Sequence, residues 1–273
     1  MNLPIFDPGH DPGPSFTELL HQSGHAPPTF DGTVEPVLSI THGTTVVAIR
    51  YADGAVMAGD RRATSGNLIS HRTIEKVFPA DRHSGVAIAG AAGPAIEMVK
   101  LFQLQLEHYE KVEGTPLSLE GKANQLSQMV RNHLPAAMQG LAVVPLFAGY
   151  DTKRATGRLF QYDVTGGRYE EQNHAATGSG SLHAGTVVKL GWRDGLSREQ
   201  AIDLAISALF QAADEDSATG GPDLVRGIFP TVATITGEGF GRVPNDEVAD
   251  RFRALISDLT VPGAEGGVEG GSS

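Results

Sequence analysis

The order of strand-like and helix-like segments after residue 43 restricts the possible fold more than any other sequence feature. Apolar and β-branched runs come in a group and two amphipathic segments follow. This order is repeated once before a last strand and a last helix. A sheet built of βαβ units would alternate strand and helix, whereas grouped strands and grouped helices are typical of α+β proteins. We therefore predict an α+β fold with two sheets, each covered by a pair of helices.

The periodicity of the apolar residues assigns the individual segments. Dense β-branched and apolar runs predict strands at Thr45–Tyr51, Ala55–Ala58, Val77–Phe78, Gly85–Ala89, Ala142–Tyr150, Arg158–Val164 and Thr231–Thr236. Apolar residues every three to four positions predict helices at Ala95–Glu110, Leu119–Met138, Leu182–Leu190, Arg198–Ala213 and Asp246–Leu259. Ser197 and Gln200 predict a capping box at the start of the fourth helix. Pro145 predicts that the strand Ala142–Tyr150 is an edge or bulged strand at that point, because proline cannot donate to a ladder.

The first 43 residues differ in character from the rest of the chain. They hold seven of the 16 prolines and five acidic residues, but no Lys or Arg. A secretory signal has a basic start and an apolar stretch, and a transit peptide is rich in Arg and poor in acids, so both are excluded. A helical pattern occurs only at residues 16–21, and the apolar content is too low to offset the entropy of ordering. We expect either a flexible tail or a removable propeptide.

Composition excludes several classes of function. The formal net charge of −11 gives no electrostatic support for binding nucleic acid or an anionic membrane, and no apolar run approaches the roughly 20 residues of a membrane span. The absence of cysteine excludes disulfides, thiolate zinc sites and cysteine nucleophiles, and it fits a cytoplasmic protein. Common nucleotide, metalloprotease and serine-hydrolase motifs are missing, and the ten histidines lack metal-ligand spacing, so no cofactor or metal is expected. The Gly-rich tail at 261–273 is expected to be disordered.

The segment His42-Gly43-Thr44-Thr45 carries the most informative chemistry. A threonine hydroxyl is a weak nucleophile and needs an adjacent base. If the Gly43–Thr44 bond were cut, the α-amino group of Thr44 would supply this base, since its free pKa of roughly 7.7–8.0 lies near working pH. Gly43 would leave its carbonyl open to attack by the Thr44 hydroxyl. Taken alone, the same residues could also simply open a strand.

Two charged residues further along the chain suit this chemistry. Asp60 lies at the end of a strand expected to pair with the strand that follows Thr44, and Lys76 opens the next strand. A lysine close to the new terminal amine would disfavour its protonation, and a nearby carboxylate would orient the lysine. Either residue alone could equally be a solvated surface charge.

Five motifs in order resemble those of proteasome β subunits. They are the run TTVVAIRYADGAVMAGDRRAT at 44–64, Lys76, Ala89-Gly90, GSGS at 178–181 and DSATGG at 216–221. The stretches LEHYEK, AAMQG and DSATGGPDLVRGIFPT are similar to the actinobacterial branch of that family. The resemblance covers essentially all of residues 44–260. It implies the four-layer α-β-β-α sandwich of N-terminal-nucleophile hydrolases, a propeptide at 1–43 and a catalytic domain at 44–260.

The resemblance also implies roles for individual residues. Thr44 would be the nucleophile, Asp60 and Lys76 the charged pair that tunes its amine, and Ser179, Asp216 and Thr219 a polar network around it. Many relatives have Ser where this chain has Thr219. The N–H of Gly90 would donate to the oxyanion, a contact worth roughly 2.7–4 kcal/mol. The first substrate pocket would be apolar and formed by Ala63, Ile74, Ile88 and Ala92.

The implied protein is a threonine endopeptidase that cleaves itself at Gly43–Thr44 and degrades unfolded proteins. The resemblance implies seven-membered β rings stacked between rings of α subunits, with an ATP-dependent unfoldase as activator. Three alternatives remain open from the sequence. They are the simpler bacterial heat-shock protease with two rings, a non-catalytic ring subunit of α type, and an N-terminal-nucleophile amidase acting on small molecules.

Overall fold

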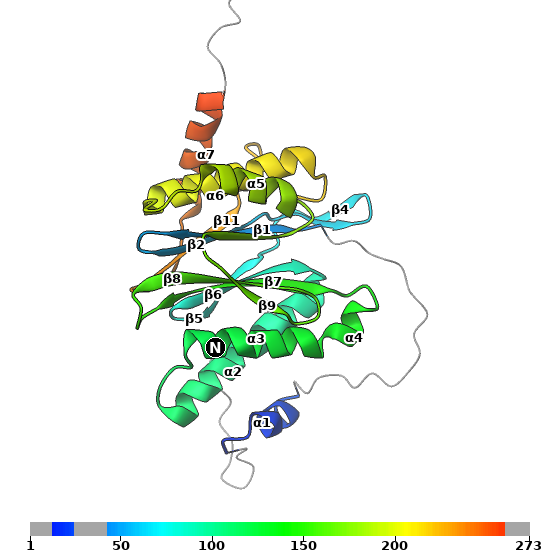
Figure 1. The fold of residues 1–273 in the computed structure, drawn as a ribbon. Helices are drawn as coiled ribbons and strands as arrows, with labels where there is room; N and C mark the ends of the chain where they lie inside the picture. Colours follow the sequence, from blue (N-terminus) through cyan, green and yellow to red (C-terminus); the bar gives the residue numbers. More distant parts are fainter. Residues whose placement is uncertain (1–12, 25–42, 260–273) are drawn as a thin grey trace, which may run out of the picture.

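The computed structural model describes residues 13–24 and 43–259, which form four layers (Figure 1). Helices α5 (Ser181–Gly191) and α6 (Arg198–Glu215) cover the first sheet, and the second sheet packs on the other face of the first. Helices α2 (Ala92–Glu113) and α3 (Leu119–Asn132) cover the second sheet. The predicted α-β-β-α sandwich is confirmed. The predicted tail at 261–273 and most of the predicted propeptide lie outside the described residues.

The first sheet has the strand order β10-β1-β2-β11-β12, and all its neighbours are antiparallel. The strands are β1 Thr45–Tyr51, β2 Gly54–Gly59, β10 His174–Gly178, β11 Thr231–Thr236 and β12 Gly239–Arg242. A two-residue turn joins β1 to β2, so Tyr51 pairs with Gly54 and Val46 pairs with Gly59. This register places the start of β1 beside the end of β2.

The second sheet has the order β5-β6-β7-β8-β9 and is also antiparallel. Its strands are β5 Val77–Asp81, β6 Ser84–Gly90, β7 Val143–Asp151, β8 Thr156–Tyr162 and β9 Arg168–Glu171. The prediction of an edge or bulged strand at Pro145 is confirmed at that point, although β7 is the central strand of the sheet. Pro145 pairs with Ile88 of β6, but the ladder with β8 begins only at Leu146. The missing N–H of Pro145 therefore interrupts no bond to β8.

Several short strands were not predicted. β3 (Ala63–Ser65) and β4 (Leu68–His71) form a separate hairpin between the predicted strands Ala55–Ala58 and Val77–Phe78, in a stretch where no strand was predicted. All four residues of β4 are exposed, so this strand lacks the alternation of apolar and polar residues that identifies a half-buried strand. Strands β9, β10 and β12 were missed as well, since each has only four or five residues.

The helices are close to their predicted bounds, with one correction. They are α2 Ala92–Glu113, α3 Leu119–Asn132, α4 Leu134–Ala137, α5 Ser181–Gly191, α6 Arg198–Glu215 and α7 Asn245–Leu259. The single helix predicted at Leu119–Met138 is wrong, because it ends at Asn132 and a short second helix follows His133. Pro135 lacks an N–H and its ring clashes with the carbonyl four residues back, so the first helix cannot continue. The capping box of Ser197 and Gln200 is confirmed.

Three groups of buried apolar residues hold the layers together. One fills the space between the two sheets, one lies between the second sheet and helices α2 and α3, and one lies between the first sheet and helices α5, α6 and α7. Phe147 of β7 belongs to the second group. It is fully buried and contacts Phe102 and Phe160 at centroid distances of 5.8 and 5.9 Å.

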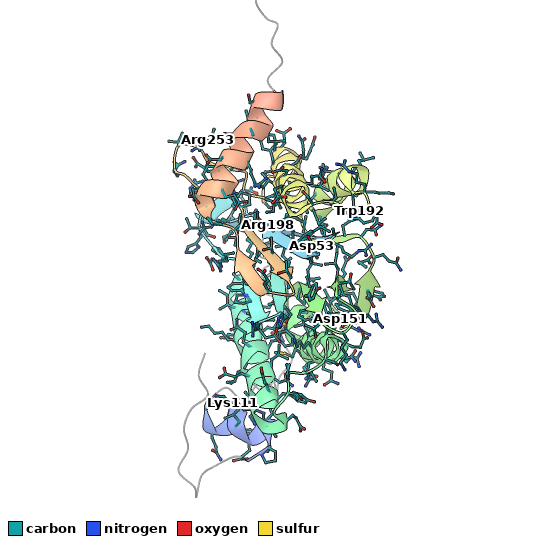
Figure 2. The ribbon with its side chains drawn as sticks, turned by 90° about the vertical axis from the view of Figure 1, so that its left-hand side faces the viewer. Asp53, Lys111, Asp151, Trp192, Arg198 and Arg253 are labelled. Carbon is teal, nitrogen blue, oxygen red and sulfur yellow. The ribbon has the colours of Figure 1, made fainter. Side chains whose placement is uncertain are left out.

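A short helix from the N-terminal segment packs on this domain. α1 (Phe16–Gln22) confirms the helical pattern expected at 16–21, and it buries Leu19 and Leu20. The ring of Phe16 lies 5.6 Å from that of His108 in α2. Figure 2 shows α1 beside the end of α2 that carries Lys111. This part of the N-terminal segment is therefore attached to the α2–α3 layer.

Replacing Phe147 by Ala tests whether this aromatic cluster supports the sandwich. We expect a loss of about 3–5 kcal/mol in the free energy of unfolding, because the substitution leaves a cavity among well-packed rings. Urea unfolding followed by circular dichroism measures it. Leu190→Ala is the control, since Leu190 is 83% exposed and its loss should cost less than about 0.5 kcal/mol. Equal effects of the two substitutions would contradict the assigned core.

Candidate active site

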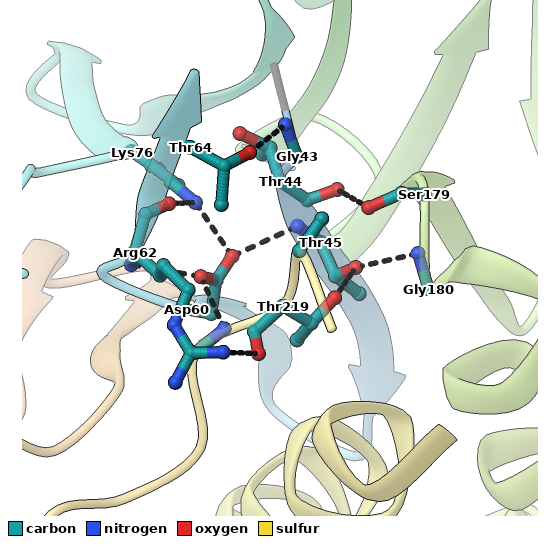
Figure 3. Close-up of polar contacts among 12 residues, drawn as sticks. Gly43, Thr44, Thr45, Asp60, Arg62, Thr64, Lys76, Ser179, Gly180 and Thr219 are labelled. Atoms are coloured by element: carbon teal, nitrogen blue, oxygen red, sulfur yellow. Dashed lines mark hydrogen bonds and ion pairs between the residues drawn. The ribbon is translucent and has the colours of Figure 1, made fainter. Parts of the chain in front are cut away.

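The candidate site lies where β1 begins and β2 ends (Figure 3). Thr44 directly precedes β1, and Asp60 directly follows β2. The antiparallel register brings the two together, and the Asp60 N–H donates to the Thr45 carbonyl at 3.1 Å. The hairpin that the sequence predicted is therefore what places the expected nucleophile beside the expected carboxylate.

The carboxylate of Asp60 is completely buried and accepts four hydrogen bonds. Oδ1 accepts from the N–H of Thr45 at 2.8 Å and from Nζ of Lys76 at 2.7 Å. Oδ2 accepts from the N–H groups of Arg62 at 2.9 Å and Gly220 at 2.8 Å. A buried charge is tolerated only when it is paired and hydrogen-bonded, and both oxygens of Asp60 meet this condition. Asp60 thereby fixes four segments of the chain around one point.

Lys76 is the buried cation of the site and is only 3% exposed. Besides Asp60, its Nζ donates to the Arg62 carbonyl at 2.6 Å. Burial lowers the pKa of Lys76 below its ordinary value, although the nearby Asp60 carboxylate opposes that shift. The lysine is therefore held in one position and gives up its proton more readily than a surface lysine.

Thr44 is 5% exposed, and its carbonyl is held by Ser179. The Ser179 N–H donates to it at 2.8 Å. The Ser179 hydroxyl oxygen also lies 3.4 Å from it, but its single proton is donated to Asp216 at the much shorter distance of 2.5 Å. This approach requires glycine at position 178, where φ is +104° and a Cβ would lie 1.8 Å from the Thr44 carbonyl oxygen. The GSGS motif thus serves to bring β10 against the backbone of Thr44.

A chain of hydroxyl groups leads from Thr45 to Asp216. The Thr219 hydroxyl donates to Asp216 at 2.6 Å, and a second oxygen–oxygen contact of 2.6 Å joins it to the Thr45 hydroxyl. Because Thr219 has a single proton to donate, the Thr45 hydroxyl must be the donor in that second contact. Thr45 in turn accepts from the Gly180 N–H at 2.9 Å. Thr219 was expected beside the terminal amine, but its hydroxyl reaches that region only through Thr45.

The carboxylate of Asp216 is the acceptor at the end of this network. Its Oδ2 also accepts the Ser179 hydroxyl at 2.5 Å, and its Oδ1 accepts the N–H of Ala218 at 3.1 Å. Burial by itself raises the pKa of Asp216, but the hydrogen bonds from Ser179, Thr219 and Ala218 outweigh burial and lower the pKa below its ordinary value. Asp216 therefore stays ionised at neutral pH and orients two hydroxyl groups.

A pocket opens beside Thr44. Its lining contains Thr44 and Gly43, the predicted Lys76 and Gly90, and all four apolar residues expected to bind substrate, namely Ala63, Ile74, Ile88 and Ala92. Gly90 has a φ of +111°, and a Cβ there would lie 2.0 Å from the Ala142 carbonyl oxygen, so no other residue fits without strain. Residues from just before β1, from β3, from the segment before β5, from β6 and from α2 thus meet in one pocket.

Sequence reasoning missed several members of the site. Glu75, Ala95 and Ile96 also line the pocket. Thr45, Arg62 and Gly180 take part in the polar network, and the Arg62 guanidinium donates to the carbonyls of Ser217 and Thr219. Arg62 could have been suspected from its position next to Asp60. For Ile96 the helical spacing from Ala92 was the only available signal.

Metal and membrane roles gain no support from the part of the chain that the structure describes. In residues 13–24 and 43–259 no group of three or more His, Asp or Glu side chains is arranged to hold a metal ion. Among the same residues no helix is long and apolar enough to cross a membrane.

Comparison with known proteins matches the chain to one family. The model of the family described as proteasome subunit matches residues 40–225. Three actinobacterial proteins named proteasome subunit beta are similar along most of their length. The protein of Acidimicrobium ferrooxidans is 61% identical over 89% of this chain and 89% of its own. That of Streptomyces griseus is 57% identical over 88% and 83%, and that of Jonesia denitrificans is 55% identical over 87% and 80%.

The matched residues 40–225 contain the polar network described above, and the three relatives are named as β subunits, so the α-type alternative gains no support. The chain therefore belongs to the proteasome subunit family, in which it is a β-type subunit.

Proposed function

We propose that this chain is the precursor of a threonine endopeptidase, in which Thr44 becomes the nucleophile once the Gly43–Thr44 bond is cut. The observation that carries the proposal is the pocket that joins Thr44, Lys76 and Gly90, behind which Asp60 pairs with Lys76 at 2.7 Å. Membership in a family of proteasome-type proteases supports the same reaction class.

Activation is an intramolecular acyl shift. The Thr44 hydroxyl oxygen attacks the Gly43 carbonyl carbon, the carbon–nitrogen bond breaks, and the hydroxyl proton ends on the Thr44 nitrogen. The product is an ester between Gly43 and Thr44 with a free α-amino group. Water then hydrolyses the ester, which releases residues 1–43 with a terminal carboxylate and restores the hydroxyl. Lys76, with its lowered pKa, is the residue of this pocket best suited to carry the proton.

Peptide hydrolysis repeats this chemistry with the new amine as base. The amine accepts the proton of the Thr44 hydroxyl while the oxygen attacks the substrate carbonyl, and it returns the proton to the leaving nitrogen. The N–H of Gly90 stabilises the oxyanion, and water releases the second product. Lys76 and Asp60 tune the amine, because a cation close to it disfavours its protonation. Ser179 holds the Thr44 carbonyl, Thr219 holds the Thr45 hydroxyl, and Asp216 orients the hydroxyl groups of Ser179 and Thr219.

We also propose the assembly and setting implied by the family. The subunits would form seven-membered β rings enclosed by rings of α subunits, and an ATP-dependent unfoldase would supply unfolded proteins to the chamber in the cytoplasm. Residues 44–260 would be the catalytic domain and residues 1–43 the removed propeptide. The two alternative enzymes would form particles that differ in size from this assembly. A simpler two-ring heat-shock protease would have no α partner, and a small-molecule amidase would elute near monomer mass in gel filtration.

Replacing Thr44 by Ala tests the nucleophile. The wild-type particle should begin at Thr44, whereas Thr44→Ala should keep Met1 to Gly43 and lose peptide turnover by at least about a thousandfold. Thr44→Ser keeps a hydroxyl and should still be processed. Intact-mass measurement and a fluorogenic peptide assay decide this. Active particles that retain residues before Thr44 would refute the mechanism.

Replacing Lys76 by Ala tests the buried cation. Processing and turnover should both fall by at least about a hundredfold, because the proton carrier and the charge beside the amine are lost. The fold should survive, since Asp60 keeps three backbone N–H donors. Lys111→Ala is the matched control, because Lys111 is more than half exposed and lies roughly 28 Å along α2 from Ala92. Normal turnover in Lys76→Ala would remove Lys76 from the mechanism.

Filling the pocket tests its proposed role in binding substrate. Ala92→Phe places a large side chain among the lining residues. Turnover of peptides with a leucine at the cleaved bond should fall about tenfold more than turnover of peptides with an alanine there. The reason is that a filled pocket excludes the larger side chain. Steady-state kinetics with the two peptides measures the ratio. An unchanged ratio would mean that this pocket does not select the substrate.

A further inference from the structure

One contact at the cleavage junction has no part in the mechanism above. The N–H of Gly43 donates a hydrogen bond of 3.1 Å to the side-chain oxygen of Thr64 (Figure 3), a residue 21 positions away that is only 6% exposed. Gly43 leaves with the propeptide, so this bond can exist only before cleavage.

The strand around Thr64 is bent in a way that makes the contact possible. β3 and β4 shift register between Ala63 and Thr64. Successive side chains of a regular strand point to opposite faces, but here Ala63 lines the substrate pocket while the Thr64 hydroxyl also reaches Gly43. A bulge re-aims side chains in this manner and is frequent next to active sites.

Two further contacts restrain the same junction. A Cβ on Gly43 would lie 1.9 Å from the Cβ of Ala218 and 2.7 Å from its carbonyl oxygen, so Ala218 closes one side of Gly43. On the other side of the bond, Ser179 holds the Thr44 carbonyl. Within the described residues, no hydrogen bond engages the Gly43 carbonyl or the Thr44 N–H. The Gly43 N–H and the Thr44 carbonyl are thus held in place, whereas the carbonyl and the N–H of the bond to be cut make no hydrogen bond among the described residues.

We propose that Thr64 is a positioning residue for self-cleavage, whose hydroxyl holds the acyl side of the Gly43–Thr44 bond in place for attack by the Thr44 hydroxyl. The inference rests on the proposed self-processing. Gly43 leaves with the propeptide, so the bond from Gly43 acts in processing. Loss of the Thr64 hydroxyl should therefore slow processing more than peptide turnover.

Two variants of the full-length chain test this role. Thr64→Val removes the hydroxyl and keeps the shape, whereas Thr64→Ser keeps the hydroxyl. We expect Thr64→Val to slow conversion of precursor to product about tenfold, and Thr64→Ser to stay within about twofold of the wild-type rate. The rate is followed by intact mass, starting when a native gel shows that particles have assembled. Wild-type speed in Thr64→Val, or equal slowing in both variants, would overturn the inference.

A second measurement separates positioning from general damage. Once each variant is fully processed, peptide turnover is compared with the processing rate. A fall in processing that exceeds any fall in turnover by about tenfold supports the proposal, and equal falls contradict it. Should Thr64→Val fail to fold, Thr64→Ala also removes the hydroxyl and takes its place. If the wild-type chain is not cut at Gly43–Thr44, the proposed function fails; if it is cut and Thr64→Val is cut equally fast, only this inference fails.

Discussion

The buried carboxylate of Asp60 is the interaction on which the arrangement of the site depends. Its four donors come from the start of β1, the residues after β2, the residue before β5 and the loop after α6. Removing a partner from a buried charge typically costs about 3–5 kcal/mol, so the four segments are strongly held in one arrangement. A carboxylate can do this because it offers two oxygens that accept from several directions. The same group that stabilises the fold locally also orients the lysine beside the nucleophile.

The site is built from both sheets. Thr44 and Asp60 adjoin strands of the first sheet, whereas Lys76 precedes β5 and Gly90 ends β6 in the second. Their relative position is therefore set by how the sheets pack. The inter-sheet core supplies Val46 and Val77 next to the site, and a Cβ on Gly59 would already lie 3.3 Å from Cβ of Lys76. Close packing of this kind leaves little freedom for the distance between Asp60 and Lys76.

Glycines make the close approaches around Thr44 possible. Gly178 and Gly90 adopt positive φ and bring backbone within reach of neighbouring carbonyls, while Gly43 fits against Ala218 only because it lacks a side chain. The precursor thus holds the junction through its backbone as much as through side chains. In the proposed mechanism the contacts to Thr44 and Thr45 remain after cleavage, whereas those to Gly43 are lost. Activation therefore depends on contacts to Gly43 that the mature enzyme no longer has.

The sequence by itself determined the grouped order of elements, the β1–β2 hairpin and the capping box, because hydrophobic period and turn residues act over a few positions. Its motifs also indicated Thr44, Asp60, Lys76 and the pocket residues, and the structure brings these together. Only the tertiary structure decided that β7 is central and that the exposed β3–β4 hairpin exists. The break in the predicted helix, by contrast, has a local cause in Pro135 that the periodicity of apolar residues did not reveal. The tertiary structure also decided the hydrogen bond from Gly43 to Thr64 and the hydroxyl chain from Thr45 to Asp216. The bonds between Gly43 and Thr64 and between Thr45 and Thr219 join residues 21 and 174 positions apart. Local pattern carries no information about which distant groups meet when the chain folds.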